Sequence, residues 1–114
     1  MIIMDKRQAQ VQGDQEVYEL NPEVKKYSLL DSGFMETNKG SFRLEHPING
    51  SSPYEARYYL RAVVSKNLDS LKLSITDKSG MHNINMFKIK DVEKEISDYR
   101  YLMNFLKEKN VLVK

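Results

Sequence analysis

Three residues of one alternating segment, Arg57, Tyr59 and Arg61, have the side chains and the spacing of a binding site. In a β-strand, residues two apart point to the same face and lie about 7 Å from one another. Two guanidinium groups that flank a phenol ring can hold a carboxylate or a phosphate by paired hydrogen bonds and stack on the ring. The row therefore predicts a small-ligand site, although arginine stems that merely cover Tyr59 on a solvated sheet face would give the same pattern. Other aromatic and basic residues of the same set are Phe42, Arg43, Tyr54 and Tyr58.

A second row, Asn83, Asn85 and Phe87, occupies every other position of a later segment. Side-chain amides beside an aromatic ring can orient a small polar ligand. Asparagines near a hairpin turn also serve as turn and cap groups, which is the alternative interpretation. The two rows together are the predicted ligand-binding residues.

Residues typical of catalysis and of metal binding are scarce. The chain has no cysteine, which excludes thiol nucleophiles, disulfides and Cys-bound metals. His46 and His82 lie far apart in the sequence, without the spacing of metal ligands. The five glycines occur singly, so the chain has no phosphate-binding loop. We therefore predict no catalytic residue, no metal and no cofactor, and an enzyme built on carboxylates such as Glu93 and Glu95 or on the two histidines stays open as a third hypothesis.

The main alternative function is single-stranded nucleic-acid binding by a sheet face, with Tyr59 and Phe87 stacking on bases. The phosphates would then meet Lys66, Lys72, Lys88 and Lys90. The 18 Lys plus Arg against 16 Asp plus Glu give a net charge of only +2, which argues against a dedicated nucleic-acid binder. A row of aromatic residues on an outward sheet face would also fit a homodimer surface.

Turn residues divide the first part of the chain into two predicted hairpins. Gly13-Asp14 lies between two extended runs within residues 7–20, and Gly40 lies between the runs 27–35 and 41–46. The Asn-Pro-Glu sequence at 21–23 is a cap followed by a first-turn proline, which predicts one short helical turn before residue 27.

Alternating apolar residues predict three further strands. The pattern is strongest over residues 54–64 and repeats over residues 71–76. Residues 77–80 then predict a turn into a third strand over residues 82–87, which would complete an antiparallel meander.

From Asp91 the apolar period changes to that of a helix. Val92, Ile96, Tyr99, Met103 and Leu106 are separated by four and three residues in turn. This spacing predicts an amphipathic helix of about five turns. We expect Asp91 to cap it and Asn110 to form its left-handed exit. The apolar residues 111–113 predict a short final strand or a segment packed under the sheet.

These elements fit a single α+β domain over residues 1–114. Mostly antiparallel strands are expected in two sheets, or in one strongly curled sheet, packed against a single long C-terminal helix. One helix cannot cover seven or so strands edge to edge, which is the reason for the split or the curl. The apolar opening over residues 1–4 is too short for a signal peptide or a membrane span, so we expect a cytoplasmic protein with no membrane partner.

Several short motifs occur in a characteristic order. They are Asn-Pro-Glu-Val-Lys-Lys-Tyr at 21–27, Leu29, Asp-Ser-Gly-Phe at 31–34, Thr37, Gly40, Phe42, Glu45, Ile-Asn-Met-Phe at 84–87, Tyr-Leu-Met at 101–103 and Val-Leu-Val-Lys at 111–114. In this order the chain resembles domain-of-unknown-function family 1831, small proteins of lactic acid bacteria and their relatives. The resemblance implies an α+β arrangement of two sheets against one helix.

The same resemblance implies a link to amino-acid metabolism on the methionine and cysteine side, through a distant likeness to S-adenosylmethionine decarboxylases. The catalytic cysteine and the self-processing serine of those enzymes have no counterpart here, so decarboxylase activity is not expected. We predict a non-enzymatic domain that binds a small, amino-acid-like ligand or assists an enzyme of sulfur amino-acid metabolism.

Overall fold

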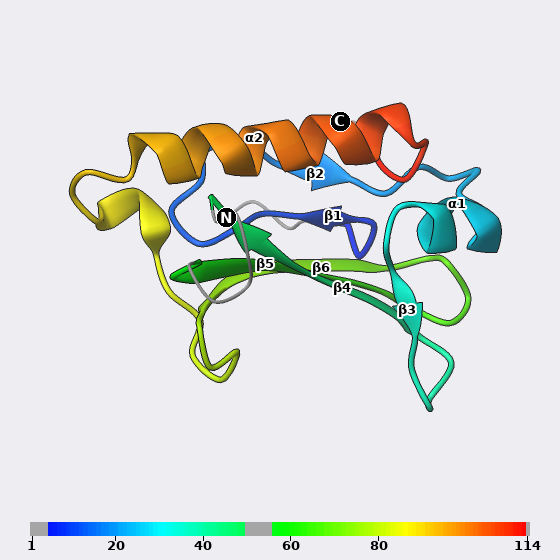
Figure 1. Cartoon of the computed structure of the whole chain (residues 1–114). Helices are drawn as coiled ribbons and strands as arrows, with labels where there is room; N and C mark the ends of the chain where they lie inside the picture. The colour runs from blue at the N-terminus through cyan, green and yellow to red at the C-terminus, as the bar shows by residue number, and fades with distance from the viewer. Residues whose placement is uncertain (1–4, 50–55, 114) are drawn as a thin grey trace.

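A computed structural model describes residues 5–49 and 56–113 of the chain, and these form an α+β fold (Figure 1). The elements in chain order are β1 (Gln8–Ala9), β2 (Tyr18–Glu19), α1 (Lys26–Asp31), β3 (Met35–Glu36), β4 (Phe42–Ile48), β5 (Tyr58–Val64), β6 (Leu71–Asp77), a 3₁₀ turn η1 (Met86–Lys88) and α2 (Glu93–Glu108). The predicted fold class is confirmed, with six strands in the described part of the chain and a second, shorter helix.

The strands form two antiparallel sheets. β1 pairs with β2, and β3, β4, β5 and β6 form a four-stranded sheet in that order. Figure 1 shows α2 running across one face of this sheet, with the β1–β2 hairpin between the two. The face of the four-stranded sheet that turns toward α2 is called the inner face below, and the opposite one the outer face.

The inner face and α2 bury the core between them. In β5, Leu60, Ala62 and Val64 are fully buried, as period-two alternation predicted. In α2, Tyr99 and Met103 are fully buried on the predicted stripe. The long strands and the long helix thus follow the apolar periods of the sequence.

The predicted strand over residues 82–87 is wrong. The chain does turn back at residues 77–80, but only Asn83 pairs with β6, in an isolated bridge to Thr76. Met86 is then fully buried in η1, and its neighbour Phe87 also packs against the core. Consecutive residues of a strand point to opposite faces, so two inward neighbours are incompatible with one.

Helix α1 replaces the extended run that we predicted from residue 27. It buries Leu29, and the Ser32 hydroxyl donates to the Ser28 carbonyl at 2.6 Å to close its last turn. The single turn expected before residue 27 does form ahead of α1: the Glu23 amide donates to Asn21 Oδ1 at 2.9 Å, and the Val24 amide donates to the Asn21 carbonyl at 3.0 Å. The hairpin that follows, β3 to β4, has the turn predicted around Gly40.

The two ends of α2 differ in how well they were predicted. Asp91 does not cap the helix, because it adopts a φ of 60° and Val92 takes the cap position without a side-chain hydrogen bond. Asn110, in contrast, makes the expected left-handed exit with a φ of 63°. Leu112 then forms a bridge with Leu20, which confirms the short final extended segment.

Among the described residues, no helix is long and apolar enough to cross a membrane.

Candidate functional site

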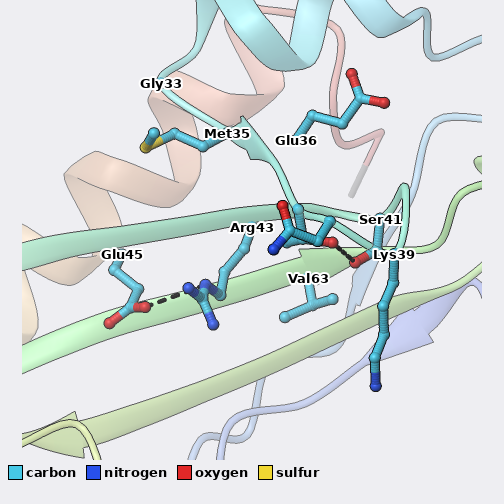
Figure 2. Close-up of a pocket in the computed structure, with 10 residues that line it drawn as sticks. Gly33, Met35, Glu36, Lys39, Ser41, Arg43, Glu45 and Val63 are labelled. Atoms are coloured by element: carbon cyan, nitrogen blue, oxygen red, sulfur yellow. Dashed lines mark hydrogen bonds and ion pairs between the residues drawn. The ribbon is translucent and has the colours of Figure 1, made fainter.

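A hollow of about 670 Å³ opens on the outer face of the four-stranded sheet (Figure 2). The β3–β4 hairpin forms one side of it, and β4 and β5 form its floor. The residues that line it are Gly33, Met35, Glu36, Thr37, Asn38, Lys39, Ser41, Arg43, Glu45 and Val63. We call it the outer hollow.

The hairpin loop that borders the outer hollow is closed by its own hydrogen bonds. The Thr37 amide donates to the Ser41 carbonyl at 2.7 Å, and their two hydroxyl groups are 2.8 Å apart. The Gly40 amide donates to the Thr37 carbonyl at 2.9 Å. These hydrogen bonds fix the backbone of the loop, which forms a wall of the hollow. They do not involve the outward-pointing side chains of the loop.

An ion pair lies on the floor of the outer hollow. Arg43 and Glu45 are two residues apart in β4, so both point to the outer face, and Arg43 Nε lies 3.2 Å from Glu45 Oε1. Arg61 of β5 is directly opposite Glu45, and its Nη2 lies 3.5 Å from Glu45 Oε2. Within the described residues no partner is found for the Nη groups of Arg43, which are therefore available to an anion.

The remaining side chains give the outer hollow balanced charge and some apolar surface. Glu36 and Lys39 add one negative and one positive charge at its rim, and Glu36 Oε1 lies 3.1 Å from Lys26 Nζ. Met35 is strongly exposed, and Val63 is half-buried on the floor. In Figure 2 the side chains of Glu36 and Lys39 extend away from the Arg43–Glu45 pair.

This arrangement can bind a small molecule that carries both charges. A guanidinium group holds a carboxylate through two parallel N–H donors. A carboxylate such as that of Glu45 accepts from an ammonium group. Because the two protein groups are neighbours, they match a ligand whose carboxylate and ammonium are also neighbours.

None of the predicted row Arg57, Tyr59 and Arg61 lines the outer hollow, although Arg61 lies opposite Glu45 of its floor. Arg57 is exposed and precedes β5, whereas Tyr59 and Arg61 occupy outer-face positions of that strand. The Arg61 guanidinium also donates to the Gly80 carbonyl at 2.9 Å. This hydrogen bond holds the turn after β6 against the sheet. The alternation of residues in the strand could not indicate it.

The second predicted row, Asn83, Asn85 and Phe87, is not brought together on one surface. Asn83 is exposed in its bridge to β6, while Asn85 packs against Gly13. The ring of Phe87 meets the ring of Tyr99 edge-on, with 5.8 Å between centroids, on the α2 side of the sheet. The three residues alternate in sequence, but the strand that would align them does not form.

The other sequence hypotheses depend on groups that the structure separates. Tyr59 on the outer face and Phe87 against α2 cannot stack on bases from one surface. Among the described residues, no three His, Asp or Glu side chains form a group that could hold a metal. His82 Nδ1 instead lies 2.9 Å from Asp77 Oδ2 in the turn after β6. Tyr54, from the wider aromatic set, lies outside the described residues.

Sequence reasoning missed Glu45 as a site residue and gave Arg43 no particular role. The signal was present, because Phe42 and Leu44 alternate with Arg43 and Glu45 and so place both charges on the solvent side of a strand. What the sequence did not reveal was the hairpin wall that turns this stretch of open sheet into a hollow.

Two comparisons with known proteins found matches to the chain. A family model described as “DUF1831: Putative amino acid metabolism” matches residues 4–113. Among solved structures, the chain is similar to the crystal structure of a DUF1831 family protein from Lactobacillus plantarum at 1.20 Å resolution. The two are 30% identical and superpose with a TM-score of 0.85 over 95% of each chain. A search of the curated proteins found no match.

Proposed function

Because the chain belongs to the DUF1831 family, as its motifs predicted, we propose that it serves amino-acid metabolism by binding a free amino acid in the outer hollow. The observation that carries the proposal is the Arg43–Glu45 pair on the floor of that hollow. The carboxylate of the amino acid would accept from the Nη groups of Arg43, and its ammonium would donate to Glu45.

The balance of charge around the outer hollow supports a zwitterion over a simple anion. Its lining contains two basic residues, Lys39 and Arg43, and two acidic residues, Glu36 and Glu45. A phosphate or a dicarboxylate would bring further negative charge beside two carboxylates that already share the nearby cations. A ligand with one charge of each sign meets a partner for both.

The apolar part of the lining favours an amino acid with an apolar side chain. Met35 and Val63 both offer hydrocarbon surface beside the ion pair. Methionine is flexible and polarisable, and it adapts to side chains of different shape. An amino acid of the methionine type therefore fits the proposal better than an acidic or basic one.

The side chains of the outer hollow favour binding over catalysis. Its two hydroxyl groups, on Thr37 and Ser41, hydrogen-bond to each other. An activated nucleophile needs a neighbouring base that takes its proton, and among the described residues neither hydroxyl is hydrogen-bonded to one. We therefore propose a binding or accessory role and not an enzyme.

The test is a calorimetric titration of the full chain with three related ligands: L-methionine, N-acetyl-L-methionine, which lacks the ammonium, and L-methioninamide, which lacks the carboxylate. We expect L-methionine to bind and each derivative to bind about tenfold more weakly, since each loses one charged hydrogen-bonding partner. Equal affinity for all three would contradict recognition of a zwitterion.

Two arginine variants locate the site. Arg43→Gln should weaken L-methionine binding about tenfold, because it removes the charged donors to the carboxylate. Arg57→Gln changes an exposed arginine that does not line the outer hollow and should leave binding unchanged. The opposite result, with Arg57 sensitive and Arg43 not, would place the ligand on the row predicted from sequence. Lys94→Gln on the exposed side of α2 controls for the loss of one positive charge.

A further inference from the structure

A second cavity, of about 460 Å³, lies between α2, the inner face of β4 and the end of α1. Its described lining is Asp31, Ser32, Gly33, Leu44, His46, Asp98, Tyr101, Leu102, Phe105 and Leu106. We call it the inner pocket. We propose that it binds a small primary amine with an aromatic or apolar body, a ligand different from the amino acid proposed for the outer hollow.

The inner pocket and the outer hollow use opposite faces of the same strand. Leu44 and His46 alternate along β4 with Arg43 and Glu45, so the first two residues point toward α2 and the second two away from it. Gly33 is the one described residue that lines both cavities. The two sites are therefore neighbours with separate chemistry.

The floor of the inner pocket is apolar. Leu44, Leu102 and Leu106 are buried, and Phe105 is half-buried beside them. A cavity of this volume is within the range that small-molecule ligands occupy. Such a floor gains free energy by covering the hydrocarbon or aromatic part of a ligand.

The rim of the inner pocket is made of hydrogen-bond acceptors and carries negative charge. Asp31 comes from the end of α1, and Asp98 from α2. The Asn49 amide donates to Asp98 Oδ2 at 2.6 Å, which fixes that carboxylate in place. No hydrogen bond or ion pair of Asp31 is found among the described residues, so its carboxylate is open to a ligand.

His46 adds a further acceptor to the rim. Its Nδ1 lies 2.8 Å from the Pro47 carbonyl oxygen, which can only accept. Nδ1 must therefore carry a proton, and in the tautomer with its single proton on Nδ1 the other ring nitrogen, Nε2, is an acceptor. A ligand ammonium has three donors, and this rim offers acceptors from both sides of the pocket.

Positive charge is absent from the described lining of the inner pocket, although the chain has 18 Lys plus Arg. Outside the pocket, Lys109 reaches one lining residue, with its Nζ 5.7 Å from the centroid of the Phe105 ring. A ligand carboxylate would therefore find two aspartates and no counter-charge in the pocket. A cation with an apolar body is the ligand whose charge and surface both match.

The test compares three probes that share a phenyl ring and a short chain: 2-phenylethylamine, 2-phenylethanol and 3-phenylpropanoate. Their binding is followed by chemical-shift changes in the spectrum of the full, isotope-labelled chain. We expect the amine to bind about tenfold more tightly than the alcohol, since it adds a charged hydrogen bond, and the carboxylate to bind more weakly than either. The shifts should centre on Leu44, Tyr101 and Phe105. An alcohol that binds as well as the amine, or shifts centred elsewhere, would overturn the proposal.

Three variants separate this site from the rest of the molecule. Asp31→Asn should weaken amine binding about threefold to fivefold, because its carboxylate is exposed and partly screened. Glu108→Gln removes an exposed carboxylate of α2 that does not line the pocket and should have no effect. Arg43→Gln should leave both the size and the location of the chemical-shift changes caused by the amine as they are. The amino-acid proposal and the amine proposal can therefore fail independently of one another. An unchanged affinity in Asp31→Asn would contradict the amine site.

Discussion

Asp14 and Arg100, which lie 86 positions apart in the sequence, form a two-point ion pair between the β1–β2 hairpin and α2. Arg100 Nη2 lies 2.6 Å from Asp14 Oδ1, and Arg100 Nη1 lies 2.8 Å from Asp14 Oδ2. The Tyr99 hydroxyl donates to the same carboxylate at 2.8 Å. The Asp14 side chain is fully buried, whereas 34% of the Arg100 side chain is exposed. This pair fastens the first sheet of the fold to its last helix.

Asp14→Asn should lower the free energy of unfolding by about 2–3 kcal/mol, because it leaves the partly buried charge of Arg100 without its counter-charge. Asparagine keeps the shape of the side chain, so packing changes little. Urea denaturation measures the loss. Glu36→Gln breaks the exposed pair with Lys26 and should cost less than about 1 kcal/mol. Similar losses of unfolding free energy in the two variants would show that the buried pair stabilises the fold no more than the exposed pair does.

The same pair makes stability depend on pH. Burial alone would raise the pKa of the Asp14 carboxyl, but hydrogen bonds from Arg100, the Glu16 amide and Tyr99 outweigh burial and hold the pKa below its ordinary value. An unfolded aspartate titrates near about 3.9. Because the folded pKa is lower, the stabilisation is complete well above that value and is lost as the pH falls through it toward the folded pKa.

The unfolding free energies of the native protein and of Asp14→Asn should therefore stay apart at neutral pH and converge as the pH falls below about 3.9 toward the folded pKa. The native carboxyl becomes protonated only as the pH falls through that lowered pKa, and it then resembles the amide. Denaturation curves at a series of pH values measure the difference. A constant difference between the two proteins over the whole range would mean that Asp14 does not supply this acid sensitivity.

Gly13 is confined by its neighbour Asn85. Gly13 has a φ of +87°, and a Cβ atom placed on it would overlap Asn85 Oδ1. Gly13→Ala should lower the free energy of unfolding by about 2–4 kcal/mol, because the backbone strain and the overlap add together. Gly33→Ala is the matched comparison, since its φ is also positive but its Cβ would meet only the flexible end of Leu44, at 3.3 Å.

Gly33→Ala should therefore lower the free energy of unfolding by only about 1–2 kcal/mol, because it introduces backbone strain without the overlap. Adding Asn85→Ala to Gly13→Ala removes the overlapping group and should recover part of the loss. Thermal unfolding of the three variants gives these differences. If the double variant recovers nothing, the overlap is not the source of the loss at Gly13.

Sequence patterns predicted the elements whose residues follow a single period. The alternation of Leu60, Ala62 and Val64 is that of β5, and the spacing of Tyr99 and Met103 is that of α2. In both cases one face is buried along the whole element, so the period of burial equals the period of the backbone. The long strands, the long helix and the fold class followed from these elements.

The elements that sequence patterns misplaced are short and are shaped by distant contacts. Residues 82–87 alternate in sequence, yet Met86 and Phe87 both pack inward because the chain must leave the sheet to begin α2. The outer hollow depends on the register that places Glu45 opposite Arg61, and on the hairpin wall beside it. No local period encodes a register or a contact between segments far apart along the chain.

Substitution of Arg61 tests whether a residue of the predicted binding row stabilises the structure. Its Nη2 donates to the Gly80 carbonyl and pairs with Glu45, and its side chain is only 30% exposed. Arg61→Gln should lower the free energy of unfolding by about 1–2 kcal/mol, since it removes a charged hydrogen bond at a half-buried position. Arg57→Gln, at an exposed position, should change it by less than about 0.5 kcal/mol.

Hydrogen exchange then shows where the structure loosens in Arg61→Gln. The turn after β6 is closed by the Asp77 amide, which donates to the His82 carbonyl at 3.0 Å, and by the Gly80 amide, which donates to the Asp77 carbonyl at 3.0 Å. Without the arginine, both amides should exchange faster, while Leu60 in the middle of β5 should keep its protection. Unchanged exchange at Asp77 and Gly80, together with unchanged stability, would mean that Arg61 does not hold the turn. Its guanidinium would then be available to a ligand on the outer face, as the sequence first predicted.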